Sequence, residues 1–366
     1  MTRVAKVHRI SANGPDDVSG IAARIADGRI DPAGIIAIFG KTEGNGLVND
    51  FSRGFAVLAL TVLLERHLPA EQAHQVCLVM SGGTEGGLVP HWLVLERGTG
   101  EGAPGPALAI GRAHTPAMPP EALGRLAQVD MVAEAVRVAM QDAGIANIDD
   151  VHFVQVKCPL LTAQRVGDAV ARGQTVSTRD TLKSMGLSRA ASALGVGVAL
   201  RELDRSSLSD AVIGTDVALW SGRASCSAGI ELTNHEVVVL GMSADWSGPL
   251  AIDHAVMADG IDIEPVRAAL ARLGLGGAGQ LVAAQRARFR ALLSKAEASH
   301  DGLLRGMRHT MLDDSDISST RHARAFVCGA LGSLIGHAEL FVSGGAEHQG
   351  PSGGGPVALI VEREGT

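Results

Sequence analysis

Three lysines and three serines are the residues whose types and order along the chain could do chemistry. The pattern Ser-(Gly/Ala)-Gly-x-Glu occurs at residues 81–85, 227–231 and 343–347, and an apolar run that ends in a lysine precedes each copy. The resulting pairs are Lys41 with Ser81, Lys157 with Ser227, and Lys295 with Ser343. A serine hydroxyl becomes an effective nucleophile when a neighbouring base takes its proton, and lysine can be that base when burial or nearby positive charge lowers its pKa. Each pair could therefore form a Ser/Lys dyad for acyl transfer.

An arginine accompanies each pair and extends the repetition. Arg53, Arg189 and Arg324 each introduce an apolar helical pattern between the lysine and the serine. A guanidinium carries several fixed N–H donors that suit carbonyl or carboxylate oxygens. Because one such coincidence means little but three in equivalent positions do not arise by chance, the chain is interpreted as an internal threefold repeat.

The elements that must position these residues recur in the same order. Each unit is predicted to contain an opening strand, a helix, the lysine strand, the linking helix, the serine strand and a final strand. The opening strands are predicted at 4–10, 107–112 and 250–254, the first helices at 15–27, 120–143 and 264–273, and the lysine strands at 35–41, 151–157 and 289–295. The linking helices are predicted at 55–68, 190–203 and 325–335, the serine strands at 76–80, 217–220 and 340–342, and the final strands at 91–96, 236–241 and 356–362. The serine is expected at the head of a hairpin-like turn between the last two strands. The third lysine run also fits a helix and is assigned as a strand by analogy with its counterparts.

These elements predict an α/β fold of three similar units. Gly/Pro-rich boundaries give units 1–103, 104–248 and 249–366, which are expected to pack around a pseudo-threefold axis with strands central and helices outside. The lysines, arginines and serines would then line one shared pocket. A small planar ring with alternating carbonyl and N–H groups suits such a pocket, because each unit can present donors to one carbonyl edge.

Composition narrows the possible partners. The 366 residues are 46% hydrophobic and carry a formal charge of −7 without a long basic run, which argues against nucleic-acid and membrane-surface partners. The sequence shows neither a signal peptide nor a membrane-spanning run. Four widely spaced cysteines, without a C-x-x-C pair, indicate reduced thiols and a cytoplasmic protein, and the histidines show no zinc motif.

The motifs SGGTEGG at 81–87 and SGGAEHQGPSGGGP at 343–356, with the lysines and arginines, resemble the ring-opening amidohydrolase family of cyanuric acid hydrolases and barbiturases. The resemblance covers essentially the whole chain. It implies a three-unit fold around one site, a small cyclic imide substrate and a homotetramer. It also implies Ser227 as nucleophile and Lys157 as base. The implied substrate-binding residues are Lys41, Arg53, Ser81, Gly82, Arg189, Ala228, Lys295, Arg324, Ser343 and Gly344.

The resemblance further implies the chemistry, which needs no catalytic cofactor. Ser227 would attack a ring carbonyl, N–H groups around Ala228 and Gly229 would hold the oxyanion, and Lys157 would return the proton to the departing ring nitrogen. Cyanuric acid would give carboxybiuret, which loses CO₂ to form biuret, and barbituric acid would give ureidomalonate. The residues alone do not select the middle pair, because the Lys-to-Ser intervals of 40, 70 and 48 residues are not diagnostic.

A Gly-rich insertion at 348–355 sets the third unit apart. Its bent backbone could offer carbonyl oxygens to a hard cation, or it could be an ordinary turn. The resemblance implies structural Mg²⁺ or Ca²⁺ held by Glu297, Ala346, Gln349, Gly350, Pro351 and Gly354. Three alternative functions remain open at this level: a barbiturase, a non-catalytic small-molecule binder, and an enzyme that forms a lysine Schiff base.

Overall fold

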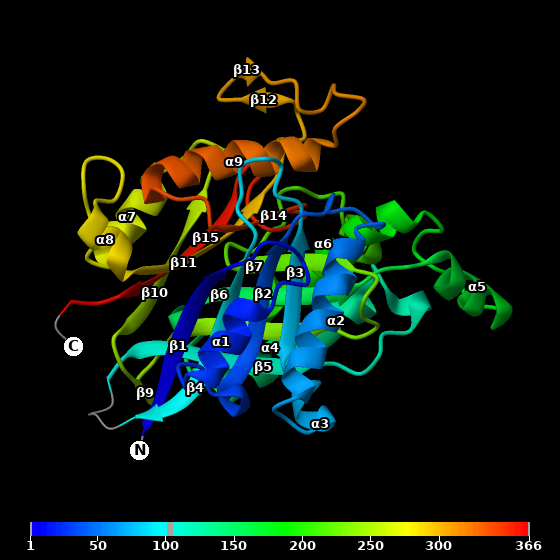
Figure 1. Cartoon of the computed structure of the whole chain (residues 1–366). Helices are drawn as coiled ribbons and strands as arrows, with labels where there is room; N and C mark the ends of the chain where they lie inside the picture. The colour runs from blue at the N-terminus through cyan, green and yellow to red at the C-terminus, as the bar shows by residue number, and fades with distance from the viewer. Residues whose placement is uncertain (1, 101–104, 365–366) are drawn as a thin grey trace.

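The computed structural model describes residues 2–100 and 105–364, and its elements follow the repeated order (Figure 1). The first third of the chain contains β1 (Thr2–Ser11), α1 (Ser19–Ala26), β2 (Ile35–Thr42), α2 (Phe51–Glu65), α3 (Ala70–Ala73), β3 (Cys77–Gly82) and β4 (His91–Gly100). The middle contains β5 (Ala107–His114), α4 (Leu126–Ala143), β6 (Val151–Pro159), α5 (Ala163–Ala171), α6 (Thr181–Ala199), β7 (Ala224–Gly229), β8 (Glu236–Ser243) and β9 (Trp246–Ser247). The last contains β10 (Leu250–Met257), α7 (Glu264–Arg272), α8 (Ala283–Arg288), β11 (Phe289–Ala296), β12 (Leu303–Leu304), β13 (Met307–Arg308), α9 (Ser319–Ile335), β14 (Phe341–Gly344) and β15 (Gly355–Glu362).

Three sheets share one strand order. The order is β1-β4-β2-β3 in the first, β5-β8-β6-β7 in the second and β10-β15-β11-β14 in the third, so the opening, final, lysine and serine strands lie side by side in that sequence each time. Each lysine strand also carries a register shift at its start, between Ile35 and Ala37, Val151 and Phe153, and Phe289 and Ala291. A β-bulge bends the strand that contains it, so the three lysine strands are bent at the same point.

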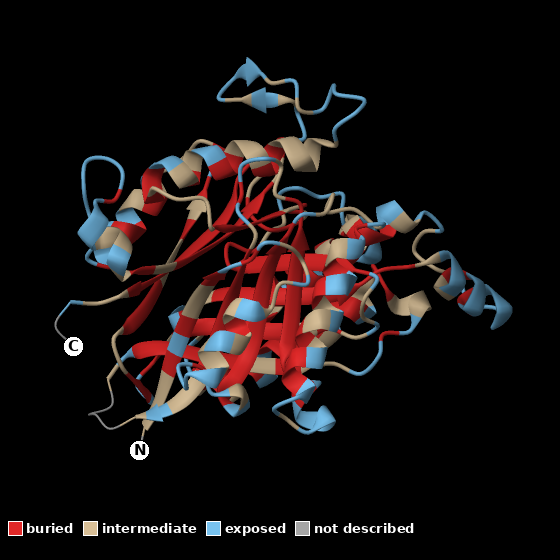
Figure 2. Ribbon diagram, viewed as in Figure 1, coloured by how far each residue is buried: buried red, intermediate tan, exposed pale blue. Residues whose placement is uncertain are grey.

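The helices cover the sheets in equivalent places. α1, α4 and α7 pack on the opening strands, and α2, α6 and α9 pack on the serine strands β3, β7 and β14. The strands are buried in the interior while the helices expose one face, as Figure 2 shows. One hydrophobic core joins all three sheets, and within it the Phe39 and Phe341 rings lie 5.5 Å apart. The serine strands β3, β7 and β14 contact one another pairwise, which brings the three serines together.

The α/β class is confirmed, and several local predictions are corrected. The second serine strand is β7 rather than 217–220, because the small residues of Ala224–Gly229 fit between the lysine strand β6 and the helix α6. The serine is not at the head of a hairpin, since β2, β6 and β11 each separate the serine strand from the final strand. Serine and lysine strands are instead parallel neighbours joined by a helical crossover.

The linking helices begin earlier than predicted. α6 starts at Thr181, where the Asp180 side chain accepts the N–H of Lys183, and α9 starts at Ser319. Arg189 therefore lies in the middle of its helix and does not introduce it. The first unit boundary, between 103 and 104, lies outside the described residues. Near the second boundary, β9 pairs with β1 and extends the first sheet.

Candidate active site

The paired strands place each lysine directly beside its serine. Lys41 is in register with Ser81, Lys157 with Ser227, and Lys295 with Ser343. Lys41 Nζ donates to Ser81 Oγ at 3.2 Å and Lys295 Nζ to Ser343 Oγ at 3.4 Å. The middle amine differs, because Lys157 Nζ lies 2.6 Å from Glu231 Oε1 in an ion pair. Residues far apart in the chain thus form three Lys/Ser pairs, of which the middle one has a carboxylate on its lysine.

The lysines also connect the three sheets in a cycle. Each amine donates to the carbonyl that precedes the serine of another sheet: Lys41 to Val342 at 2.8 Å, Lys157 to Met80 at 2.9 Å, and Lys295 to Cys226 at 2.9 Å. These bonds are buried, where a hydrogen bond is worth more than in water and a missing partner costs more. The cycle fixes the serine strands against one another around a common centre.

The arginines form a second cycle with the glutamates of the Ser-x-Gly-x-Glu motifs. Arg189 Nη2 lies 2.6 Å from Glu347 Oε1, Arg324 Nε donates to Glu85 Oε1 at 3.2 Å, and Arg53 Nε lies 3.6 Å from Glu231 Oε1. In each pair the arginine is on a linking helix and the glutamate follows the serine strand of a different third of the chain. The motif glutamates received no role from the sequence, although their threefold recurrence was the signal that could have given them one.

Nine predicted residues line one cavity of about 270 Å³ at this centre. They are Arg53, Ser81, Gly82, Arg189, Ser227, Ala228, Arg324, Ser343 and Gly344. Gly46, Met80 and Met185 line the same cavity and were not predicted. Ser227 Oγ and Ser343 Oγ are 3.0 Å apart, so hydroxyls of two sheets meet across it. The lysines lie behind the serines.

A wider cleft of about 1100 Å³ shares Gly46, Met185, Arg189 and Gly344 with this cavity. These shared residues form the passage between the two spaces. Gly46 has φ of 72° and Gly345 has φ of 76°, the left-handed region that glycine adopts without strain, and a Cβ at either position would lie within 2.8 Å of an arginine side chain. Glycine is needed here so that the backbone can pass close to the guanidinium groups.

Burial lowers the pKa of all three lysines. It lowers the pKa of Lys41, with help from the Arg324 charge, and it lowers the pKa of Lys295 to about 7. It also lowers the pKa of Lys157, although the Glu231 carboxylate opposes part of this effect. Desolvation disfavours the charged amine, which is the change that a lysine needs in order to act as a base.

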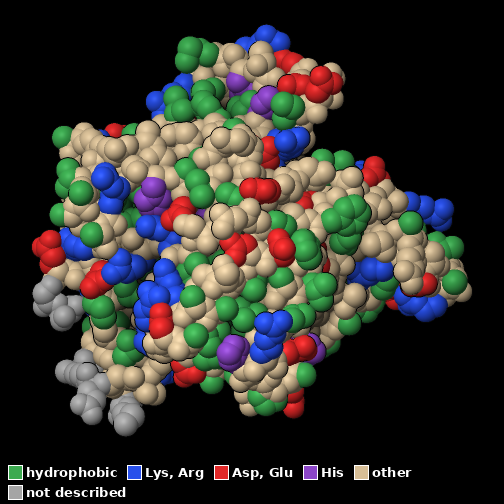
Figure 3. Space-filling model, viewed as in Figure 1, with side chains coloured by type: hydrophobic (Ala, Val, Ile, Leu, Met, Phe, Trp, Pro, Cys, Tyr) green, Lys and Arg blue, Asp and Glu red, His purple; other side chains and the backbone are tan. Residues whose placement is uncertain are grey.

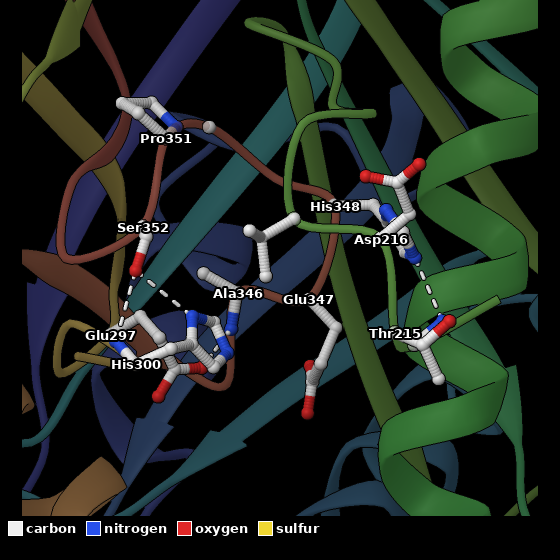
Figure 4. A pocket seen from close by; sticks show the side chains of 12 residues that line it. Thr215, Asp216, Glu297, His300, Ala346, Glu347, His348, Pro351 and Ser352 are labelled. Carbon is white, nitrogen blue, oxygen red and sulfur yellow. Dashed lines mark hydrogen bonds between the residues drawn. The ribbon is translucent and has the colours of Figure 1, made fainter. Parts of the chain in front are cut away.

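The predicted metal ligands Ala346, Gln349, Gly350, Pro351 and Gly354 lie in the loop between β14 and β15, and Glu297 directly follows β11. Figure 4 shows Glu297, His300, Ala346 and Ser352 around a separate pocket of about 360 Å³. Gly350 and Pro351 also line it, whereas Gln349 turns inward and its Oε1 accepts the N–H of Cys226 at 2.6 Å. The Glu297 carboxylate accepts the N–H of Ala346 at 2.7 Å. The loop thus connects the predicted ion site to the strand that carries Ser227.

The cavity is lined by serine hydroxyls and arginines, with buried lysines behind them, and these are groups that an enzyme can use for nucleophilic catalysis. The family description "Amidohydrolase ring-opening protein" matches residues 6–362. The chain belongs to this family of ring-opening amidohydrolases.

Two curated relatives share most of this chain. "Cyanuric acid amidohydrolase" of Azorhizobium caulinodans is 66% identical over 98% of this chain and 99% of its own length. The protein of the same name from Bradyrhizobium sp. is 63% identical over 99% of this chain and 98% of its own.

Two solved structures have the same fold. The crystal structure of cyanuric acid hydrolase from A. caulinodans superposes with a TM-score of 0.92 at 65% identity, covering 99% of this chain and 100% of that one. A second cyanuric acid hydrolase, described as an innovation by structural concatenation, gives 0.94 at 48% identity with the same coverage. Within the described residues, no helix is both long and apolar enough to cross a bilayer.

Proposed function

We propose that this enzyme opens the ring of cyanuric acid by hydrolysis to carboxybiuret, which then loses CO₂ to form biuret. The observation that carries the proposal is the cavity of about 270 Å³ that receives a serine from the serine strand and an arginine from the linking helix of each third of the chain. Cyanuric acid presents three equivalent carbonyls in one plane, and each sheet can donate to one of them. The names of the full-length relatives support the same substrate.

In the proposed reaction Ser227 is the nucleophile and Lys157 is its base. Lys157 takes the Ser227 proton as Oγ attacks a ring carbonyl, and it gives that proton to the ring nitrogen that leaves. Backbone N–H groups near Ala228 and Gly229 would hold the oxyanion, and Ser81 and Ser343 would bind the other two carbonyls. Water then attacks the acyl-enzyme, which restores Ser227.

The equivalent sheets support a fold made of three concatenated units, 1–103, 104–248 and 249–366, around a pseudo-threefold axis. The cyclic Lys-to-carbonyl and Arg-to-Glu contacts are the relations that such an axis would generate. Because a symmetric cavity suits a symmetric ring, the fold and the substrate proposal support each other.

We also propose that copies of this chain assemble as a homotetramer. Phe51, Phe55, Leu58 and Val62 on α2 are 74%, 50%, 59% and 42% exposed, and hydrophobic side chains reach the surface over α2 in Figure 3. Their spacing places them on one face of the helix. An exposed apolar stripe of this kind is typical of a subunit interface.

The described cysteines, all free and buried, support a reducing compartment such as the cytoplasm.

We propose that Glu297 and the loop beside it bind a structural Mg²⁺ or Ca²⁺ ion. Burial and the neighbouring Glu347 carboxylate raise the pKa of Glu297, so a cation there would relieve both effects. Glu297 and backbone carbonyls of Ala346, Gln349, Pro351 and Gly354 would hold the ion, with Gly350 as the turn between them. The ion would supply charge neutralisation and would hold the loop that binds the Cys226 N–H through Gln349.

The ion should therefore stabilise the folded protein. After treatment with a chelator, millimolar Mg²⁺ or Ca²⁺ should raise the Tm of the wild type by about 2 °C or more, because a ligand that binds only the native state stabilises it. The variant Glu297→Gln should show a much smaller rise. Equal rises in both proteins would place the ion elsewhere, and no rise in the wild type would remove the proposed site.

The substrate proposal is tested by incubating the purified enzyme with cyanuric acid and, separately, with barbituric acid. We expect release of CO₂ and formation of biuret from the first, at a kcat/KM well above that for the second. Turnover of barbituric acid alone would make the enzyme a barbiturase, and tight binding of both rings without turnover would make it a binding protein. Reductive trapping with borohydride should leave every lysine unmodified, since no Schiff base is formed.

A further inference from the structure

A second cavity lies behind Lys157 and is distinct from the substrate cavity. It measures about 480 Å³ and is lined by residues of α2, α3, β3, β6 and β8, together with the loop that precedes β8. Lys157, Glu231 and Glu236 are its ionisable groups besides His74. The His74 side chain is 64% exposed, so the cavity reaches the surface at α3. Lys157 thus lies between two spaces, one holding the serines and one leading to solvent.

Glu236 lies beside Lys157 on the adjacent strand of the middle sheet. The two residues are direct partners in the antiparallel pairing of β6 with β8, which places their side chains on the same face. Both side chains reach β3 of the first sheet, where Lys157 Nζ donates to Met80 O at 2.9 Å and Glu236 Oε2 accepts the N–H of Leu78 at 2.8 Å. Burial raises the pKa of Glu236 to about 7, so this carboxyl can both accept and release a proton near neutrality.

The arrangement is present in the middle sheet alone. Glu236 and His91 are the direct strand partners of Lys157 and Lys41, and the pairing of Ser294 with Val357 places Pro356 opposite Lys295, so only one of the three positions is an acid. Glu85 and Glu347 make hydrogen bonds to arginines, whereas Glu231 is turned to Lys157 and stays 3.6 Å from Arg53. A threefold binding pocket does not need this asymmetry, but a single catalytic base does.

The proposed reaction releases one proton in each turnover. In acylation the Ser227 proton moves through Lys157 to the ring nitrogen. In deacylation water supplies one proton to restore Ser227 Oγ, and its oxygen with the second hydrogen forms a carboxyl group that is ionised at neutral pH. As it ionises, the new carboxyl group gives this surplus proton to the neutral Lys157 amine, and the proton must then leave a site that is closed by buried side chains.

We propose that Glu231 and Glu236 form a proton path that carries this surplus proton from the Lys157 amine into the cavity behind it and out past α3. This inference rests on the proposed function of Lys157 as the base. Glu231 receives the proton directly from the ammonium group at 2.6 Å, and Glu236 passes it to the solvent side of the cavity. The positive charge of Arg53 near Lys157 favours loss of the proton from the ammonium group. Glu231 and Glu236 are positioning and proton-transfer residues that do not contact the substrate.

The test is the variant Glu236→Gln. The glutamine side chain has the same size and keeps an oxygen that can accept the Leu78 N–H, but it cannot take up and release the proton. We expect kcat for cyanuric acid to fall at least about tenfold with little change in KM, since proton transfer by a positioned group contributes factors of this size or more. The solvent deuterium isotope effect on kcat should rise. Imidazole buffer, a small proton carrier that can enter the cavity, should restore part of the rate, and Glu236→Asp should retain more activity than the amide.

His91→Gln is the matched control, because His91 is the equivalent strand-start residue opposite Lys41. Its kcat should stay near the wild-type value and should not respond to imidazole. Wild-type kcat in Glu236→Gln, or a loss that imidazole does not restore while the Tm also falls, would overturn the path. Either result would leave the proposed function intact, because that function fails only if the wild type does not open the ring.

Discussion

Ser227→Ala is expected to lower kcat for cyanuric acid by about 10⁴-fold or more, because no acyl-enzyme can form without the nucleophile. The substrate should still bind, since Ser81, Ser343 and the three arginines line the same cavity. The measurement is kcat by release of CO₂ together with the Kd of cyanuric acid by calorimetry. A lost hydroxyl changes little volume, so the variant should fold like the wild type.

Ser81→Ala and Ser343→Ala are the matched controls. Each removes one donor to a carbonyl that does not react, and we expect losses of about 10- to 10²-fold in kcat/KM, below the range for removal of an oxyanion donor. The distances alone favour another pair, since Lys41 donates to Ser81 at 3.2 Å while Lys157 is bound to Glu231. Catalytic hydrogen bonds often tighten only when the substrate binds, so these distances are compatible with Ser227 as the nucleophile. A larger loss in Ser81→Ala than in Ser227→Ala would move the reaction to the first sheet.

Much of the site could be predicted because the sequence repeats it. A letter pattern that recurs three times places Lys41, Lys157 and Lys295 at strand ends, and the structure puts each in register with the predicted serine. The third lysine strand, which fits a helix by its own pattern, was correctly assigned through its two counterparts. Repetition supplied information that the local periodicity of one segment lacks.

The second serine strand shows where this reasoning fails. Residues 217–220 are apolar, which predicts a strand there, whereas β7 has the sequence ASCSAG with none of the β-branched residues that are enriched in strands. Every residue of β7 is buried because α6 and β6 pack against it. The start of α6 was also missed, although Asp180 followed by a helical run is an N-cap signal.

The contacts between the three sheets could not be predicted from the sequence. Arg324 and Glu85 are 239 positions apart, and the Arg-to-Glu cycle depends on which neighbour each sheet faces. The same is true of Glu236, whose position opposite Lys157 follows from an antiparallel register between β6 and β8. One-dimensional spacing identifies equivalent residues, but the asymmetry that distinguishes the middle pair appears only when the three sheets are packed together.

Lys157→Met should have the second largest effect, a loss of about 10³-fold in kcat/KM for cyanuric acid. Methionine fills the space of the lysine stem but cannot take the Ser227 proton. Glu231 would keep the cationic Arg53 at 3.6 Å, so the variant does not leave an isolated buried carboxylate. Lys41→Met and Lys295→Met are the matched controls and should lose less, since they remove structural bonds to Val342 and Cys226.

The role of Lys157 as the base also predicts the direction in which kcat/KM changes with pH. Burial lowers the pKa of Lys157, and only the neutral amine can act as a base, so wild-type kcat/KM should fall as the pH drops through the lysine pKa and should level off above it. In Lys157→Met the residual rate should lose this acidic limb. Methylamine added to the variant Lys157→Ala should restore part of the rate. The restored rate should increase at higher pH, where more of the methylamine is neutral. An acidic limb that survives in Lys157→Met but disappears in Lys295→Met would assign the base to the third sheet, where burial lowers the lysine pKa to about 7.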